Sequence, residues 1–196
     1  MNRKEIETMG ADVIKRYLDS QKNWITRLYA KCQLILVGKR LDWFAKCDVL
    51  DIGCGRGVLE ASFGNYSRSF TSCDIVDTNF YGIDVKLCSA ECLVFGNNEF
   101  DSVFMLGVIE HVEIPDLAVR ECRRILRSGG KLIMSIPNGF VWWFMWLAQP
   151  LLPEHLRKHA RFGQKQLYQL MDGWKLLSRR PIIPGLFWLY EFEVEK

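Results

Sequence analysis

A short run of alternating glycines follows an acid near the middle of the first half of the chain. Residues 49–57 read Val-Leu-Asp-Ile-Gly-Cys-Gly-Arg-Gly, so Asp51 ends an apolar run and glycines stand at positions 53, 55 and 57. Glycine accepts positive φ and has no side chain to keep a ligand away from the backbone. The next residues read as a helix start, where N–H groups lack partners within the helix. The pattern predicts a binding site for a nucleotide-like ligand.

The glycine spacing separates the ligand classes that use such a loop. A dinucleotide-binding G-x-G-x-x-G needs a third glycine at position 58, which is Val58. A phosphate-binding loop needs Gly-Lys-Ser/Thr after it, and none follows. The observed order is D-x-G-x-G-x-G. On this stretch alone, a tight strand-to-helix turn with no ligand remains an open alternative.

Strands and helices alternate around this loop. Apolar runs predict strands at about 47–53, 70–76, 85–89, 102–106 and 131–136, and helices at about 56–65 and from Pro115 until Gly129-Gly130 stops the second. Only about ten residues link the second and third strands, too few for more than one helical turn. Nearly unbroken apolar strands suit a parallel sheet that is buried on both faces.

The flanking segments complete the expected architecture. Amphipathic patterns predict helices over 3–19 and from Ser20 to about Gly38, before the core. After the core, 166–171 reads as a helix, and 174–179 and 187–194 read as strands. We therefore predict an α/β fold with a doubly wound, mostly parallel, seven-stranded sheet, N-terminal helices and an aromatic insertion after strand five.

Three further segments carry polar residues at the ends of predicted strands. They are Asp74-Ile75, 89–101, and 108–112 together with 121–131. With the glycine loop they follow one another in an order that resembles the S-adenosylmethionine-binding core of class I methyltransferases, particularly the type 11 small-molecule group. The resemblance covers about residues 47–138, and the combination is far more specific than any one segment. It implies a Rossmann-like methyltransferase fold and S-adenosylmethionine as the cofactor.

The resemblance also implies roles for individual residues. The glycine loop holds the methionine part of the cofactor with Asp51 near its ammonium, and Asp74 accepts the ribose hydroxyls. The Ala90-Glu91 turn corresponds to the adenine contact, where Ser89 replaces an aspartate common in the family. The carbonyls of Leu106 and Gly107 face the ammonium. The implied cofactor-binding set is Asp51, Gly53, Cys54, Gly55, Gly57, Asp74, Ile75, Ser89, Ala90, Glu91, Leu106 and Gly107.

Methyl transfer requires few catalytic side chains, because the sulfonium is already activated and the protein mainly aligns an acceptor. An oxygen acceptor still has to lose its proton. His111, with Glu110 beside it, is the candidate base, and a histidine that starts a helix and bonds the backbone is the alternative. Ubiquinone-type O-methyltransferases resemble this stretch and carry a metal-associated Glu-x-x-Glu-His. Gly107 replaces the first acid here, so we predict no metal.

The sequence therefore predicts methyl transfer to a small-molecule or lipid-like acceptor. A catalytically inactive module that binds cofactor or a protein partner is the second hypothesis. A nicotinamide-dependent dehydrogenase is the third, and the glycine spacing disagrees with it. The sequence argues against nucleic acid as the acceptor, because strand five ends in 136–138, Ile-Pro-Asn, without a base-methylation motif. The oligomeric state has no signal in the sequence.

Composition and charge bound the class of protein. The 196 residues are 49% hydrophobic and 25% charged, which fits one domain with a substantial core. The net charge is +3, but it is unevenly distributed, because the central part of the chain is acidic and both ends are basic. Seven cysteines without a C-x-x-C pair, and a polar segment 1–8, predict a reducing, cytoplasmic location. We expect one domain over 1–196, divided into a helical cap (1–46), the cofactor core (47–138) and an acceptor-side lid with the last two strands (139–196).

An aromatic segment follows the fifth predicted strand. Residues 140–152 are almost wholly apolar but too short to span a bilayer, which takes about 20 residues. Tryptophan favours places where an apolar environment meets water. The segment is expected to form the lid of an apolar acceptor pocket and to contact a membrane surface, and burial against the sheet is the alternative. The predicted substrate residues are Trp142, Trp143, Trp146, His155 and His159.

Overall fold

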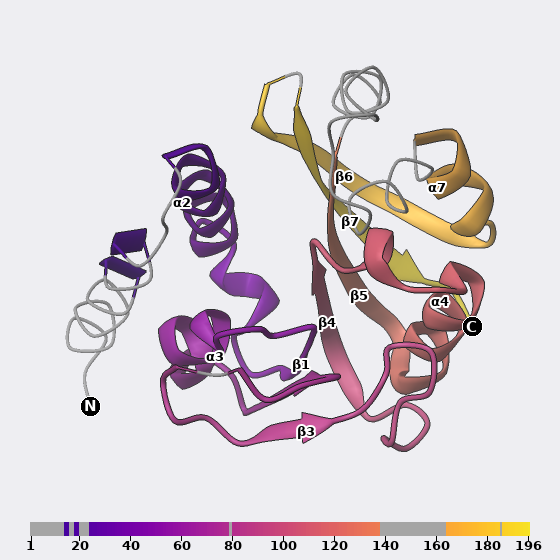
Figure 1. Ribbon diagram of the computed structural model, residues 1–196. Coiled ribbons are helices and arrows are strands. Elements are labelled where there is room, and N and C mark those ends of the chain that lie inside the picture. The colour runs from indigo at the N-terminus through magenta and orange to yellow at the C-terminus, as the bar shows by residue number, and fades with distance from the viewer. Residues whose placement is uncertain (1–13, 16–17, 20–23, 79, 138–163, 185) are drawn as a thin grey trace.

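The described residues form a seven-stranded sheet (Figure 1). The computed structural model describes residues 14–15, 18–19, 24–78, 80–137, 164–184 and 186–196. The strand order is β3-β2-β1-β4-β5-β7-β6. β1 to β5 run parallel, and β7 lies antiparallel between β5 and β6. The strands are β1 (Asp48–Ile52), β2 (Ser69–Asp74), β3 (Val85–Leu87), β4 (Phe100–Leu106), β5 (Leu126–Pro137), β6 (Trp174–Ile183) and β7 (Phe187–Val194).

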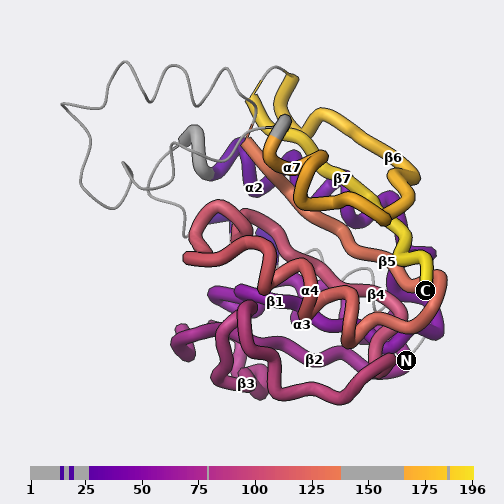
Figure 2. The backbone as a smooth tube through the Cα atoms, turned by 90° about the vertical axis from the view of Figure 1, so that its right-hand side faces the viewer, coloured from indigo at the N-terminus to yellow at the C-terminus, as the bar shows by residue number. Residues whose placement is uncertain are grey.

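Helices cover both faces of the sheet. Figure 2 shows α4 and α7 in front of the strands and α2 behind them. The described helices are α2 (Trp24–Gly38), α3 (Val58–Phe63), α4 (Pro115–Ile125) and α7 (Gln164–Leu170), with 3-10 turns η1 (Leu41–Trp43), η2 (Gly64–Tyr66) and η3 (Ile109–His111). The predicted α/β fold with a doubly wound, mostly parallel, seven-stranded sheet is confirmed.

Each face of the sheet has its own hydrophobic core. One core packs α4 and α7 against β4, β5 and β7, with Cys122 and Leu167 fully buried. The other packs α2, η1 and α3 on the opposite face, where the ring of Phe44 stacks between Phe63 and Phe104. Burial on both faces explains why the central strands read as continuous apolar runs.

The predicted end of the fourth helix is wrong. α4 ends at Ile125, and Gly129-Gly130 lies inside β5, which begins at Leu126. Leu126 already pairs with Phe100 of β4, so sheet pairing overrides the helical pattern. A Cβ on Gly130 would lie 2.8 Å from the Arg127 carbonyl oxygen. This glycine therefore permits a close backbone approach and does not stop a helix.

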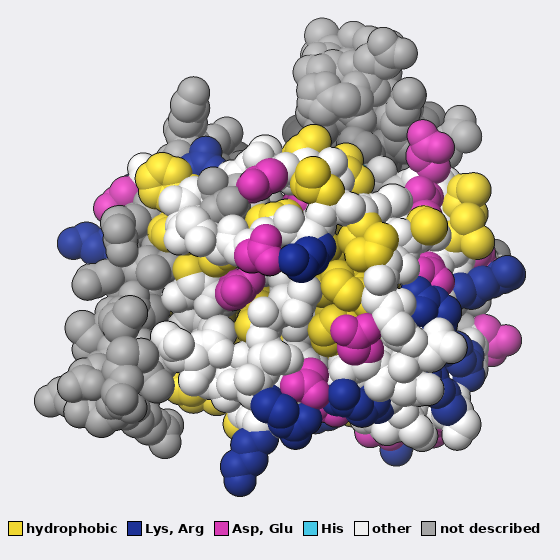
Figure 3. Space-filling view, turned by 90° about the horizontal axis from the view of Figure 1, so that it is seen from below, with side chains coloured by type: hydrophobic (Ala, Val, Ile, Leu, Met, Phe, Trp, Pro, Cys, Tyr) yellow, Lys and Arg dark blue, Asp and Glu magenta, His cyan; other side chains and the backbone are white. Residues whose placement is uncertain are grey.

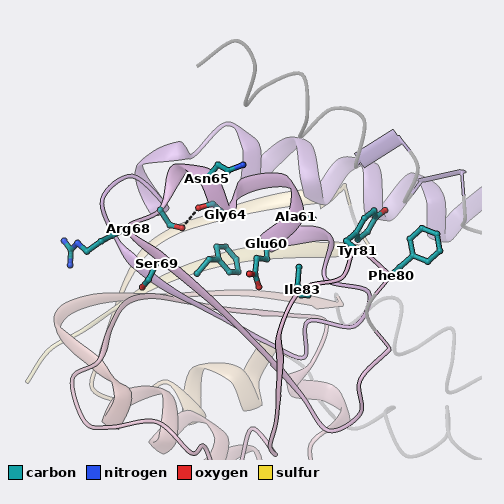
Figure 4. A pocket seen from close by; sticks show the side chains of 11 residues that line it. Glu60, Ala61, Gly64, Asn65, Arg68, Ser69, Phe80, Tyr81 and Ile83 are labelled. Carbon is teal, nitrogen blue, oxygen red and sulfur yellow. Dashed lines mark hydrogen bonds between the residues drawn. The ribbon is translucent and has the colours of Figure 1, made fainter. Parts of the chain in front are cut away.

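The connection between β2 and β3 contains no helix among its described residues, as predicted. Right-handed crossovers between successive neighbouring strands place their helices on the same face of the sheet. Because the described part of the β2–β3 connection has no helix, the position beside α3 on this face is not covered by one. A groove of about 770 Å³ lies there, lined at one end by Arg68 and at the other by Phe80 and Tyr81 (Figure 4). None of the predicted cofactor residues lines it.

The β3 edge of the sheet faces solvent. Ile75, Val76 and Leu87, from the end of β2 and from β3, are exposed. Seen from this side, hydrophobic side chains gather in the middle of the face, and charged ones surround them (Figure 3).

Two predicted segments lie largely or wholly outside the described residues. They are the helix over 3–19 and the aromatic segment 140–152, so the division of the chain into cap, core and lid stays a prediction. α2 ends at Gly38, as the sequence predicted. None of the described helices has the length and hydropathy needed to cross a membrane.

Candidate active site

Parallel pairing brings the predicted site residues to one edge of the sheet. In the register, Asp51 of β1 lies beside Ser72 of β2 and Phe104 of β4. The strands end a few residues later, so the loops after β1, β2, β3 and β4 emerge together. Ligands of open α/β sheets bind at this carboxyl edge.

The glycine loop turns tightly from β1 into α3. The N–H groups of Gly53 and Cys54 both donate to the carbonyl oxygen of Cys73, at 2.8 and 3.1 Å. Gly53 has a φ of +70°, and a Cβ there would lie 2.4 Å from Val108 Cγ2. Gly57, also left-handed, is the N-cap of α3. These positions accept glycine alone without strain.

Asp74 connects the end of β2 to the glycine loop. Its Oδ2 accepts a hydrogen bond of 2.8 Å from the Gly55 N–H, and its Oδ1 accepts one of 2.7 Å from the Ile75 N–H. Oδ1 also accepts a longer bond of 3.4 Å from the Val76 N–H, and Oδ2 keeps a second lone pair for another donor. The carboxylate is thus held in place at the position from which it is predicted to bind ribose.

Asp51 is buried among other acids. Its side chain is 4% exposed, and burial, followed by the charges of Glu60 and Asp74, raises its pKa well above the usual range. A buried carboxylate in such a position is stabilised by a cation next to it. The group of acids therefore fits the ammonium of an amino-acid ligand.

Two cavities flank the glycine loop and share Gly53. The larger, of about 430 Å³, brings together the ends of β2, β3 and β4. Its lining includes eight of the predicted residues, Gly53, Asp74, Ile75, Ser89, Ala90, Glu91, Gly107 and His111. It also includes Ile52, Cys88, Val108, Val112 and Glu113, which were not among the predicted site residues, although Ile52, Val108 and Val112 belong to the segments that carry the resemblance.

The smaller cavity, of about 300 Å³, lies on the α2 side of the loop. Five predicted residues line it, Asp51, Gly53, Cys54, Gly55 and Leu106. Gln33 of α2 and Arg56 of the loop also line it. Neither was predicted, and Gln33 had no signal because it is distant in sequence and lies on an ordinary amphipathic helix.

Glu110 and His111 are the last two residues of η3, which begins shortly after β4 ends at Leu106. His111 is exposed at the larger cavity, and its N–H donates to the Val108 carbonyl at 2.8 Å. Burial raises the pKa of Glu110 to about 7. A carboxyl group with this pKa can give or take a proton near neutral pH.

Glu91 also has a structural contact that the sequence did not reveal. Its Oε1 accepts a hydrogen bond from the Ile114 N–H, and Ile114 is the N-cap of α4. The Glu91 N–H donates to the Ser89 hydroxyl at 3.2 Å. The predicted adenine-contact turn therefore positions the start of α4 as well as lining the cavity.

The predicted substrate residues are not tested by this geometry. Trp142, Trp143, Trp146, His155 and His159 all lie outside the described residues. Within the described part of the chain, no three His, Cys, Asp or Glu side chains gather as metal ligands could.

Known proteins resemble the chain over this site. Residues 50–134 match the family model described as a methyltransferase domain. A ubiquinone biosynthesis O-methyltransferase from Xanthomonas oryzae pv. oryzae is 33% identical over 118 residues, which are 54% of this chain and 49% of that protein. The chain thus matches about half the length of such curated relatives.

Solved structures share the fold at lower identity. A protein from Pyrococcus horikoshii superposes with a TM-score of 0.70 at 16% identity, covering 90% of this chain and 93% of that one. A methyltransferase from Thermotoga maritima, named as a possible histamine N-methyltransferase, gives 0.68 at 20% identity, covering 94% and 99%. These likenesses concern the fold alone.

Proposed function

Because the chain belongs, through residues 50–134, to the class I S-adenosylmethionine-dependent methyltransferases, we propose that it transfers a methyl group from S-adenosylmethionine to a small-molecule acceptor. The observation that supports this best is the pair of cavities that meet at Gly53, with Asp74 facing one and Asp51 the other. S-adenosylmethionine has an adenosine half and an amino-acid half, and two adjoining cavities could each hold one of them.

The residues fit the cofactor chemically. Asp74 would accept the ribose hydroxyls, and 89–91 would border the adenine. The glycine loop would admit the methionine part against its backbone, since a Cβ on Gly55 would have no heavy atom within 4 Å. Asp51 would lie near the ammonium, where a positive charge offsets the repulsion among the acids.

The bound cofactor supplies an activated methyl group, and the chain supplies alignment and a base. We propose that Glu110 or His111 takes the proton of an oxygen acceptor. Burial favours Glu110, because its pKa of about 7 makes half of it available as base at neutral pH. His111 is favoured by its exposed position at the larger cavity.

Two observations bear on the class of acceptor. The relatives named for ubiquinone biosynthesis are O-methyltransferases, which favours oxygen as the atom methylated. The apolar segment 140–152 favours a lipid-like acceptor, and we propose that it lies over the acceptor side. An inactive module that only binds cofactor or a partner is disfavoured, because Asp51, Asp74 and the loop glycines are all in place.

Two measurements test the function. Titration calorimetry with S-adenosylhomocysteine asks whether the cofactor site is competent, and micromolar binding is expected. Release of S-adenosylhomocysteine is then followed with a panel of hydrophilic phenols, quinols with short and long apolar tails, and amines. Absence of S-adenosylhomocysteine binding would contradict the proposal. Binding without turnover on any acceptor would favour the inactive module.

A further inference from the structure

Three polar side chains from α2 and β5 close a hydrogen-bonded triangle at the carboxyl edge. The Gln33 amide nitrogen donates to the Tyr29 hydroxyl at 2.9 Å and to the Ser135 hydroxyl at 2.8 Å. The two hydroxyl oxygens are 3.0 Å apart. Ser135 is fully buried, and the Tyr29 ring packs on Phe187 with centroids 4.4 Å apart. The triangle and the ring contact together fix the position of the Tyr29 hydroxyl.

The Tyr29 hydroxyl faces the same space as the Glu110 carboxylate. A Cβ on Gly107 would lie 3.9 Å from Tyr29 Oη and 3.9 Å from Glu110 Oε1. Both distances are ordinary contact distances, so the glycine leaves room for a small group between these oxygens. One oxygen comes from α2 and the other from η3, and β4 ends between them.

This space adjoins the junction of the two cavities. Gly107 lines the larger cavity, Leu106 and Gln33 line the smaller one, and Gly53 lines both. Ser135 pairs with Leu106 in the sheet, so the triangle borders the same place. In S-adenosylmethionine the sulfur joins the adenosine half to the methionine half, and it is expected where the two cavities meet.

We propose that the Tyr29 hydroxyl and the Glu110 carboxylate form the wall that the transferred methyl group faces, and that this wall selects acceptors through a hydrogen-bond-donating hydroxyl or amine. The inference rests on the proposed function and extends it to the acceptor. Gln33 and Ser135 are positioning residues, because they act through Tyr29. Both wall oxygens can accept hydrogen bonds, and a carbon or thioether acceptor has no hydrogen to offer them.

The transfer step balances for a hydroxyl acceptor. The Glu110 carboxylate takes the hydroxyl proton, and an oxygen lone pair forms the new bond to the methyl carbon. The carbon–sulfur bond breaks, and its electron pair stays on sulfur. The products are a methyl ether, S-adenosylhomocysteine and protonated Glu110, which returns its proton to water. A neutral amine acceptor loses one N–H proton in the same way.

The test needs no acceptor, because two cofactor analogues probe the wall directly. S-adenosylhomocysteine lacks the transferred methyl group, and sinefungin carries an amine-bearing carbon in place of the methylated sulfur. Calorimetry on the full chain is expected to show sinefungin binding at least about tenfold more tightly, as charged hydrogen bonds allow. In Tyr29→Phe this preference falls to about twofold or less, while the Kd for S-adenosylhomocysteine stays unchanged.

Matched variants separate positioning from general stability. Tyr168→Phe removes an exposed hydroxyl on α7 and is expected to keep the full preference. Ser135→Ala and Ser102→Ala both remove a buried strand hydroxyl. Both are expected to lower the melting temperature, and only Ser135→Ala is expected to lower the preference for sinefungin.

Each outcome decides one of the two proposals. If the unmodified chain does not bind S-adenosylhomocysteine, the proposed function fails. If it binds but shows no preference for sinefungin, or if Tyr29→Phe keeps the preference, the inference is overturned and the proposed function stands. Glu110→Gln is the second variant should Tyr29→Phe not fold, and it is expected to lose the preference equally.

Discussion

The Asp74 carboxylate accepts a 2.8 Å hydrogen bond from the backbone N–H of Gly55. The acid that is predicted to bind the ribose therefore also holds the loop that is predicted to bind the methionine part. This bond connects the two halves of the candidate cofactor site, in addition to the bonds from the Gly53 and Cys54 N–H groups to the Cys73 carbonyl. A change at Asp74 should act on both halves.

Asp74→Ala is expected to weaken S-adenosylhomocysteine binding by about 1.5–3 kcal/mol, because a charged acceptor for two hydroxyls is lost. Asp74→Asn should lose less, since its amide oxygen can still accept the Gly55 N–H. Calorimetry measures both. Asp84→Ala is the control, because it removes an exposed acid from the connection between β2 and β3, and it should leave the affinity unchanged. Unchanged affinity in Asp74→Ala would remove the ribose assignment.

Substitutions at two loop glycines should affect different properties, stability in one case and cofactor binding in the other. Gly53→Ala places a Cβ 2.4 Å from Val108 Cγ2 and should destabilise the fold by about 2–4 kcal/mol. Gly55→Val has open space around its Cβ and should fold with a loss of about 1–2 kcal/mol, yet it should block cofactor binding. Urea unfolding and calorimetry distinguish the two. Normal binding by Gly55→Val would show that the ligand does not approach the loop.

Glu110→Gln should raise stability while lowering turnover. Between about pH 4.5 and 7 the folded state keeps a proton that the unfolded state has lost, so the free energy of unfolding falls as pH rises through this window. At pH 8 the variant should be more stable than the unmodified chain by about 3 kcal/mol. At pH 4 the two should be nearly equal. Urea unfolding at both pH values checks this, and an equal difference at both would contradict it.

His111→Ala is expected to keep S-adenosylhomocysteine affinity within about twofold and to slow turnover. If His111 is the base, the loss should be on the order of 100- to 10,000-fold. Steady-state kinetics on an acceptor identified by the panel measures it. A loss of only a few-fold would assign the proton transfer to Glu110 and leave His111 as a neighbour.

Among the acids outside the candidate site, Glu191 should cause the largest loss of stability when it is removed. It is buried in β7, and it accepts hydrogen bonds from Arg40, Trp43 and Ser178. Burial alone would raise its pKa, but these bonds outweigh burial and lower it. Glu191→Ala should cost about 3 kcal/mol near neutral pH.

The pH dependence follows from the sign of this shift. The stabilisation that Glu191 contributes to the folded state is fully present above its ordinary pKa, near 4.5. It is lost as pH falls through the lower pKa that Glu191 has in the folded state. Acid unfolding of Glu191→Gln should therefore be less steep below pH 4.5. Glu193→Ala, on the same strand but in a partly exposed ion pair with Lys175, should cost less than about 1 kcal/mol.

Local sequence was sufficient for the parts of the site that a short segment forms by itself. The glycine loop, Asp74 and 89–91 each lie at the end of a strand or just after it, and parallel pairing alone brings the ends of such strands together. The resemblance predicted the doubly wound, mostly parallel sheet that these strands form. The end of α4 could not, because pairing between Leu126 and Phe100 depends on a partner strand that the local pattern does not contain.

The contacts that hold the acceptor-facing wall could not be predicted from the sequence. Gln33 and Ser135 are 102 positions apart, and each is unremarkable in its own element. A glutamine on an amphipathic helix and a serine near the end of a strand predict only a solvated face and a small core residue. Their shared contact with Tyr29 exists only after α2 has packed over the end of β5.

The place of β7 between β5 and β6 has a consequence for how the protein is made. β6 leaves the ribosome before β7, but no β5–β6 pairing exists for it to adopt. Until β7 has been synthesised, the long β5 presents an open edge of backbone donors and acceptors, the kind of edge that pairs with other chains. The nascent protein is therefore exposed to aggregation between the synthesis of β5 and that of β7, and chaperone dependence should concentrate in this interval.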